Sequence, residues 1–295
     1  MPVERIGGDA ERAIASVLNQ EAPFAFELIV VSAQPLQMLE RAGVRNVIEG
    51  DRNPATRRNR AASVAVGEVL AFIDDDAVAD PKWLATACAY LDAHPDVLAV
   101  GGPDPAPPDS PVNELISDTL LAAKYIGSGV AAHENRRGVF DLTRASDVAL
   151  VNLFVRRDAF TGFDEEIGYI GEDTALLAEL MQRGRVVYHE EVRVFHRRRA
   201  FPGPYLRQRW RYRVKTGQLQ SERRDPRVTA FVVAGAIGLL FAPLFAIPYA
   251  LLTLVLGVRV TRLPPRYWPL IPFYFAMHHL TYWGGIVTGI TSRRK

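Results

Sequence analysis

Short apolar runs alternate with longer amphipathic stretches along residues 1–196. Continuous apolar runs predict buried strands at residues 26–32, 69–73, 97–100, 186–189 and 192–196. Helical patterns fall between them at residues 58–66, 80–93 and 173–183. Strands that alternate with helices of this length predict an α/β domain with a mostly parallel sheet and helices on both faces.

Two helix ends carry local signals. Asp80 and Pro81 are typical of a cap followed by proline in the first helical position, so we expect a helix to begin there. Gly184 is typical of a helix end and closes the pattern at residues 173–183.

The C-terminal pattern is different, because two long stretches carry no formal charge. Residues 228–258 and 267–292 each exceed the roughly 20 apolar residues that a helix needs to cross a bilayer core. They predict two transmembrane helices, with a pair of buried core helices as the alternative. Pro243 and Pro248 predict a kink or a hairpin in the first stretch. The second stretch contains His278 and His279, and we expect it to be interfacial or packed against protein.

Charge divides the chain into three regions. The net charge of +2 conceals an acidic body (1–196), a basic collar (197–227) and an acid-free tail (228–295). We therefore expect a soluble α/β domain, an amphipathic segment on anionic membrane lipids and a membrane region, with no nucleic-acid partner. Arg223, Arg224 and Arg227 precede the first stretch, which predicts that residues 1–227 lie on the cytoplasmic side of the inner (plasma) membrane.

Composition narrows the class of protein. Residues 1–8 have no apolar run, so no N-terminal signal is expected. Hydrophobic residues make up 48% and charged residues 23%, values that exclude a disordered chain. Cys88 is the only cysteine, which excludes an intrachain disulfide.

Three carboxylates, those of Asp74, Asp75 and Asp76, directly follow the strand predicted at residues 69–73. Adjacent acids repel one another unless a cation lies between them. Hard oxygen ligands of this kind suit Mg²⁺ or Mn²⁺, which also bind substrate phosphates. A solvated acidic turn is the alternative.

Two further signals are weaker when taken singly. Glu172 and Asp173 begin the helix predicted at residues 173–183, where acids are common for electrostatic reasons alone. His196 ends the last predicted strand, and a lone histidine is more often structural than a ligand.

Together these features resemble one family. Five segments occur in order at fitting spacings: residues 54–61 (PATRRNRA), 67–83 (GEVLAFIDDDAVADPKW), 152–164 (NLFVRRDAFTGFD), 171–174 (GEDT) and 192–196 (VRVFH). The chain resembles the family-2 glycosyltransferases, which have the GT-A fold and transfer a sugar from a nucleotide-sugar. The C-terminal stretches are similar to those of membrane-attached bacterial members that make surface polysaccharides or glycolipids.

The resemblance implies roles for individual residues. Asp74 and Asp76 match the Asp-x-Asp pair, with Asp76 on Mg²⁺ or Mn²⁺ and Asp74 on the metal or the ribose. His196 matches a histidine that completes the metal site in some relatives. Asp173 matches the general base of a single, inverting displacement. The donor pocket would also include Pro2, Val3, Arg58, Asn59 and Asp75, and the acceptor, either lipid-linked or a saccharide, would face Asn152, Glu172 and Trp210.

The chain also departs from the family. Its first strand is truncated, or the true start lies upstream. Ser32, Ala33 and Gln34 replace an acid that contacts the base in relatives. Leu206 stands where processive relatives have glutamine, which favours transfer of one sugar. Trp210 could stack on a sugar or anchor the chain at a membrane interface.

Two alternatives to a glycosyltransferase remain. The segment FIDDDAV also fits the opening motif of haloacid-dehalogenase phosphatases, although it lies far from the N-terminus. The truncated strand also fits a non-catalytic membrane scaffold.

Overall fold

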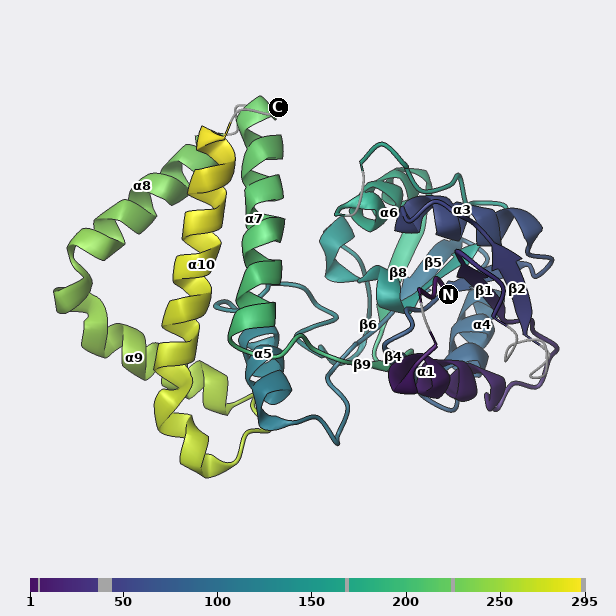
Figure 1. Cartoon of the computed structure of the whole chain (residues 1–295), viewed down its shortest axis with the longest axis horizontal. Coiled ribbons are helices and arrows are strands. Elements are labelled where there is room, and N and C mark those ends of the chain that lie inside the picture. Colours follow the sequence, from purple (N-terminus) through teal and green to yellow (C-terminus); the bar gives the residue numbers. More distant parts are fainter. Residues whose placement is uncertain (5, 37–43, 168–169, 224–225, 293–295) are drawn as a thin grey trace. The chain divides into compact units, whose positions relative to one another are not determined.

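The computed structural model describes residues 1–4, 6–36, 44–167, 170–223 and 226–292, without the side chains of residues 220–223, 226–229, 231 and 239. The chain forms two compact units, each described by itself (Figure 1). Unit 1 comprises residues 1–107 and 130–197. Unit 2 comprises residues 108–129 and 198–295.

Unit 1 is an α/β unit with three small sheets. The largest has the strand order β3-β7-β5-β8-β6, a second pairs β1 with β2, and a third pairs β4 with β9. The strands are β1 (Ile29–Ser32), β2 (Arg45–Ile48), β3 (Val69–Phe72), β4 (Ala77–Ala79), β5 (Val97–Gly101), β6 (Val139–Asp141), β7 (Leu153–Arg156), β8 (Arg185–His189) and β9 (Val194–His196). The helices are α1 (Gly8–Leu18), α3 (Pro54–Val64), α4 (Trp83–Ala93) and α6 (Glu172–Arg183), with 3₁₀ turns η1 (Ala145–Asp147) and η2 (Leu150–Asn152).

The prediction of a mostly parallel sheet is wrong, because the sheet is mixed. Only β5 and β8 pair in parallel in the five-stranded sheet as described, whereas β3–β7, β7–β5 and β8–β6 are antiparallel. Strands β7 and β6 are the reason: β7 runs between β3 and β5 and opposes both, and β6 opposes β8 at the edge of the sheet. An apolar run does not reveal strand direction, so the sequence pattern could not show this.

All five predicted strands are present: β1, β3 and β9 are shorter than predicted, and β5 and β8 are each one residue longer. The three predicted helices are also found. Strands β2, β4, β6 and β7 were not predicted. Helix α4 begins at Trp83 and not at Pro81, because residues 81–82 form a turn in which Asp80 Oδ1 accepts a hydrogen bond from the amide of Lys82.

The sheet is buried on both faces. Leu153 and Phe154 are adjacent on β7 and belong to different core clusters, because successive strand residues point to opposite faces. Phe154 packs with Trp83 of α4 at a ring-centroid distance of 4.5 Å. Leu153 lies in the cluster that contains Leu177 of α6. Helices therefore cover both faces, as the sequence predicts.

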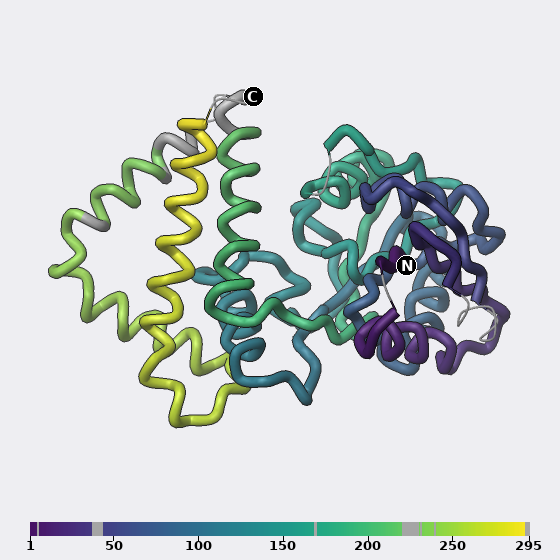
Figure 2. The backbone as a smooth tube through the Cα atoms, in the orientation of Figure 1, coloured from purple at the N-terminus to yellow at the C-terminus, as the bar shows by residue number. Residues whose placement is uncertain are grey.

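Unit 2 is helical. It contains α5 (Val112–Ala122), α7 (Gly203–Arg223), α8 (Pro226–Leu240), α9 (Ala242–Val258), the 3₁₀ helix η3 (Pro265–Leu270) and α10 (Ile271–Thr291). Helices α7 and α10 run side by side over most of their length (Figure 2). Glycines permit the close contact: a Cβ atom on Gly289 would lie 2.2 Å from the carbonyl oxygen of Val214.

The predicted transmembrane helices are not confirmed. Among the described helices, none is long and apolar enough to cross a bilayer by itself; residues 232–238 and α9 meet the criterion only as a pair bent by 101°. The break precedes Pro243, whereas Pro248 lies inside α9. In the predicted basic flank, Arg224 lies outside the described residues, and the side chains of Arg223 and Arg227 are not described.

Candidate active site

The acidic turn lies where β3 ends, and strand pairing brings a histidine to it. Residues 74–76 connect β3 to β4, and β4 pairs antiparallel with β9 so that Ala77 lies opposite His196. Nε2 of His196 consequently lies 3.1 Å from Oδ1 of Asp76. Gly102 is needed nearby, since a Cβ atom there would lie 2.0 Å from the carbonyl oxygen of Val192, just before β9.

Asp74, Asp76 and His196 together have the composition of a divalent-metal site. One ligand atom from each lies within 4.8 Å of the others. All three side chains are partly exposed, which leaves room for water and phosphate oxygens. Two carboxylates suit Mg²⁺ or Mn²⁺, and the imidazole nitrogen favours Mn²⁺, because Mg²⁺ takes oxygen ligands. The three predicted ligands therefore fit a divalent metal ion, Mn²⁺ or Mg²⁺.

A buried carboxylate lies behind His196. Asp104 is fully buried; its Oδ2 lies 3.6 Å from Nδ1 of His196, and its Oδ1 lies 2.8 Å from Nδ1 of His133. The separation of 3.6 Å from His196 is longer than a hydrogen bond. A carboxylate that bonds the far nitrogen is the usual means of orienting a metal-binding histidine, and Asp104 is placed for that role. Sequence reasoning missed Asp104 and His133. Asp104 closely follows the predicted strand at residues 97–100. An acid just after a buried strand is the signal that identified Asp74, and it could have identified Asp104 as well.

Arg58 joins the acidic turn to the start of α6. Its Nη2 donates to Oδ1 of Asp74 at 2.9 Å, and its Nη1 donates to Oε1 of Glu172 at 3.2 Å. Arg58 lies in α3, where Asn53 caps the helix by accepting a hydrogen bond from the amide of Ala55. Both Arg58 and Glu172 are buried. By bonding to both carboxylates, Arg58 holds the side chain of Asp74 close to that of Glu172.

The first turn of α6 carries Glu172 and Asp173. Gly171 precedes it with φ of +103°, a conformation that favours glycine. Burial, and next the charge of Asp173, raises the pKa of Glu172, while Arg58 opposes the shift. Asp173 is more exposed than Glu172. The two acids thus have different environments despite being adjacent.

Two predicted contact residues have structural hydrogen bonds. The Asn59 amide donates to the carbonyl of Phe163 and to Glu165, each at 2.8 Å, and its Oδ1 accepts from the amide of Phe163. Asn152 is fully buried: it accepts from Trp83 Nε1 at 2.8 Å and donates to two backbone carbonyls. Both side chains already bond to protein, so their predicted ligand contacts stay predictions.

The other predicted residues lie in several places. Asp75 is partly exposed in the acidic turn. Residues 1–3 lie beside β1: Pro2 forms a parallel bridge with Val31, and buried Val3 donates its amide to the Val31 carbonyl. Trp210 belongs to α7 of unit 2 and is 40% exposed.

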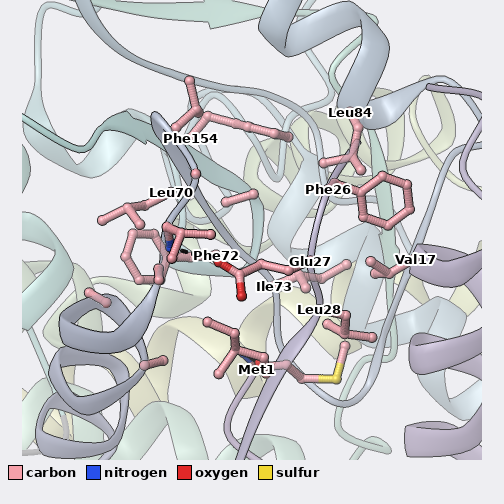
Figure 3. Close-up of a pocket in the computed structure, with 18 of the residues that line it drawn as sticks. Met1, Val17, Phe26, Glu27, Leu28, Leu70, Phe72, Ile73, Leu84 and Phe154 are labelled. Atoms are coloured by element: carbon pink, nitrogen blue, oxygen red, sulfur yellow. Dashed lines mark hydrogen bonds between the residues drawn. The ribbon is translucent and has the colours of Figure 1, made fainter. Parts of the chain in front are cut away.

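A cavity of about 490 Å³ lies within unit 1 between β1 and β3 (Figure 3). Leu28 and Phe26 line one side, and Leu70, Phe72 and Ile73 line another. Its lining is largely apolar, with Arg57 and Arg58 among its few charged groups. Because it offers few polar partners for a sugar or a diphosphate, we place the candidate site at the acidic turn.

Comparison with known proteins assigns the family. The model of Glycosyl transferase family 2 matches residues 7–160, which is more than half of the chain. The chain belongs to glycosyl transferase family 2. The matched span includes Arg58, Asp74 and Asp76, and the family assignment replaces the phosphatase alternative.

Individual relatives are more distant. A glucosyl-dolichyl phosphate glucuronosyltransferase of Haloferax volcanii is 30% identical over 163 residues, which are 50% of this chain and 48% of that protein. The chain thus spans about half the length of this curated relative. The crystal structure of S. aureus TarS 1-349 has a TM-score of 0.50 at 15% identity, covering 97% of this chain and 89% of TarS. A Pyrobaculum calidifontis mannosyltransferase in complex with GDP-Man and Mn²⁺ has a TM-score of 0.49 at 18% identity, covering 98% of this chain and 71% of that one. The likeness to TarS supports the GT-A-like fold.

Proposed function

We propose that this chain transfers one sugar from a nucleotide-sugar donor to a lipid-linked or saccharide acceptor, and that it depends on Mn²⁺ or Mg²⁺. One observation carries the proposal: Asp74, Asp76 and His196, which come from two distant segments, converge at the end of β3. A bound cation would neutralise the charge that develops on the leaving diphosphate.

The chain's own residues would hold the acceptor and move its proton. Asp173 would accept the proton of the acceptor hydroxyl as that oxygen attacks the anomeric carbon, in a single displacement with inversion. Glu172, held by Arg58 at 3.2 Å, would orient the same hydroxyl. Arg58 would also keep Asp74 in place for the donor.

Unit 2 supports a lipid-linked acceptor at a membrane, and the arginine cluster Arg223, Arg224 and Arg227 supports the cytoplasmic face of the plasma membrane. Large apolar side chains are exposed on α8 and α9, including Ile237, Leu244, Phe245, Ile247 and Leu251. Exposed apolar area of this kind is typical of a membrane or protein contact. The Haloferax relative, by its name, acts on a dolichyl phosphate glycolipid. Leu206 supports transfer of a single sugar.

The test is a screen of nucleotide-sugars with the full chain in detergent, Mn²⁺ and polyprenyl phosphate lipids. We expect release of nucleoside diphosphate from one donor, loss of this activity in EDTA, and its loss in Asp76→Asn. Asp158→Asn, an exposed acid elsewhere in unit 1, is the matched control. Lipid binding without turnover of any donor would support the scaffold alternative, and turnover that persists in EDTA would contradict the metal site.

A further inference from the structure

Helices α7 and α10 hold two arginines and a histidine in one aromatic cluster. Arg209 and Arg213 lie one turn apart on α7. The guanidinium carbon of Arg213 lies 3.5 Å from the ring centroid of Tyr282, and that of Arg209 lies 4.8 Å from Tyr212. The hydroxyl of Tyr205 bonds to Nδ1 of His278 at 2.7 Å.

Three nitrogen atoms in this cluster are buried without a hydrogen-bond partner among the described residues. They are Nε of Arg209, Nε of Arg213 and Nε2 of His278. His278 is 2% exposed, so its ring is shielded from bulk solvent. A buried donor without an acceptor is destabilising and rare in folded proteins, which makes three in one place unusual.

Among the side chains that the structure describes on α7 and α10, none carries a negative charge. Residues 203–219 and 271–291 contain no acid. Asp118 of α5 is engaged by Arg198 at 2.9 Å and Arg262 at 3.1 Å. Burial lowers the pKa of Arg213 to about 10, so the side chain still carries its charge near neutral pH. Buried cations are costly unless an anion pairs with them.

We propose that Arg209, Arg213 and His278 form a binding site for a phosphate or diphosphate group. Guanidinium groups bind phosphate with paired N–H donors, and both arginines are partly exposed, so an anion can reach them. When Tyr205 donates to Nδ1, the neutral His278 ring carries its proton on Nε2 and adds a third donor. The assignment of this group to a lipid-linked acceptor rests on the proposed function; a nucleoside diphosphate is the other source of the same chemistry.

The alternative is a purely structural role, in which Arg213 stabilises the helix pair by its cation–π contact with Tyr282. The two roles differ in one respect. An unpaired buried charge is a liability until an anion binds, so its removal does not lower stability in anion-free buffer. Removal of a structural cation–π contact lowers stability with or without an anion.

The experiment uses the full chain in detergent with EDTA, which prevents metal-dependent binding in unit 1. Calorimetry measures the affinity for inorganic pyrophosphate, farnesyl phosphate and UDP, and thermal unfolding is followed with and without each. We expect Arg209→Gln and Arg213→Gln each to weaken pyrophosphate binding by about tenfold or more, a change of about 1.4 kcal/mol. Arg211→Gln, an exposed arginine on α7, is the control and should change affinity less than about twofold.

The outcomes are distinct. Tighter binding of farnesyl phosphate than of UDP assigns the site to the lipid, and the reverse order assigns it to the nucleotide. Equal losses in Arg211→Gln and Arg213→Gln would indicate non-specific charge and overturn the site. A lower unfolding temperature of Arg213→Gln without anion, at unchanged affinity, would overturn it in favour of the structural role. The screen of nucleotide-sugars tests the proposed function separately, so the anion site and the proposed function can each fail without the other.

Discussion

Nε2 of His196 lies 3.1 Å from Oδ1 of Asp76 because β9 pairs with β4 in one register. A shift by one residue would turn His196 to the opposite face of the ladder. The candidate metal site is thus a consequence of strand pairing between segments far apart in the chain.

The first prediction concerns metal affinity. His196→Ala removes one of three ligands, so we expect the affinity for Mn²⁺ in the presence of UDP to fall by about tenfold or more. Electron paramagnetic resonance of free Mn²⁺ measures the change. His94→Ala, a histidine outside the triad in unit 1, should bind Mn²⁺ like the parent. Equal affinity of both variants would remove His196 from the site.

The second prediction concerns the base. Asp173→Asn keeps the shape of the side chain and removes its basicity, so we expect kcat to fall by about 100-fold or more. The KM for the donor should change little, because a base acts in the transition state. Glu172→Gln should cost less in kcat and raise the KM for the acceptor. If Glu172→Gln is the inactive variant instead, the two roles must be exchanged.

The third prediction concerns pH and Glu172. Burial raises the pKa of Glu172 above its ordinary value of 4.5. The folded chain therefore holds this proton more tightly than the unfolded chain, and the contribution of Glu172 to the free energy of unfolding falls as pH rises from 4.5 through the raised pKa. Urea unfolding should show parent stability declining over this interval relative to Glu172→Gln. Glu166→Gln, an exposed acid, should follow the parent; parallel profiles for parent and Glu172→Gln would contradict the assignment.

The fourth prediction concerns the cavity. Ala71 is exposed in β3 although it lines the apolar cavity. Ala71→Ile adds apolar groups to this space with a β-branched residue that suits a strand, so we expect the free energy of unfolding to rise by about 1 kcal/mol. Ala71→Asn adds polar groups of similar reach and should lower it. Chemical denaturation measures both, and a loss of stability in Ala71→Ile would mean that the cavity lacks room.

The fifth prediction concerns membranes. Leu244 and Ile247 on α9 are 76% and 74% exposed. Charging both, as Leu244→Asp with Ile247→Asp, should reduce co-sedimentation with lipid vesicles by about tenfold or more, since each buried apolar side chain is worth about 1.5–3 kcal/mol. Val139→Asp alters an exposed apolar residue of unit 1 and serves as the control. Unchanged sedimentation of the α9 variant would argue against insertion of this helix.

The sequence by itself determined the local elements that carry the candidate site residues. The apolar run at residues 69–73 became β3, and the acids after it therefore emerge at a strand end. The pattern at residues 173–183 became α6, with Gly171 before it and Gly184 after it. These features depend on neighbours in the chain, which periodicity and turn residues report directly.

Only the tertiary structure decided strand direction and which polar groups meet, whereas Pro243 and Pro248 already predicted a kink or hairpin in the first apolar stretch. Strand β7 enters antiparallel between β3 and β5, and nothing in the letters of residues 153–156 encodes that direction. Asp104 behind His196, the bridge from Arg58 to Glu172, and the unpartnered nitrogens of Arg209 and Arg213 all join residues distant in the chain or depend on the packing around them. The physical reason is that hydrogen bonding and burial are set by partners in space, whereas a sequence pattern records only the order of residues along one strand or helix.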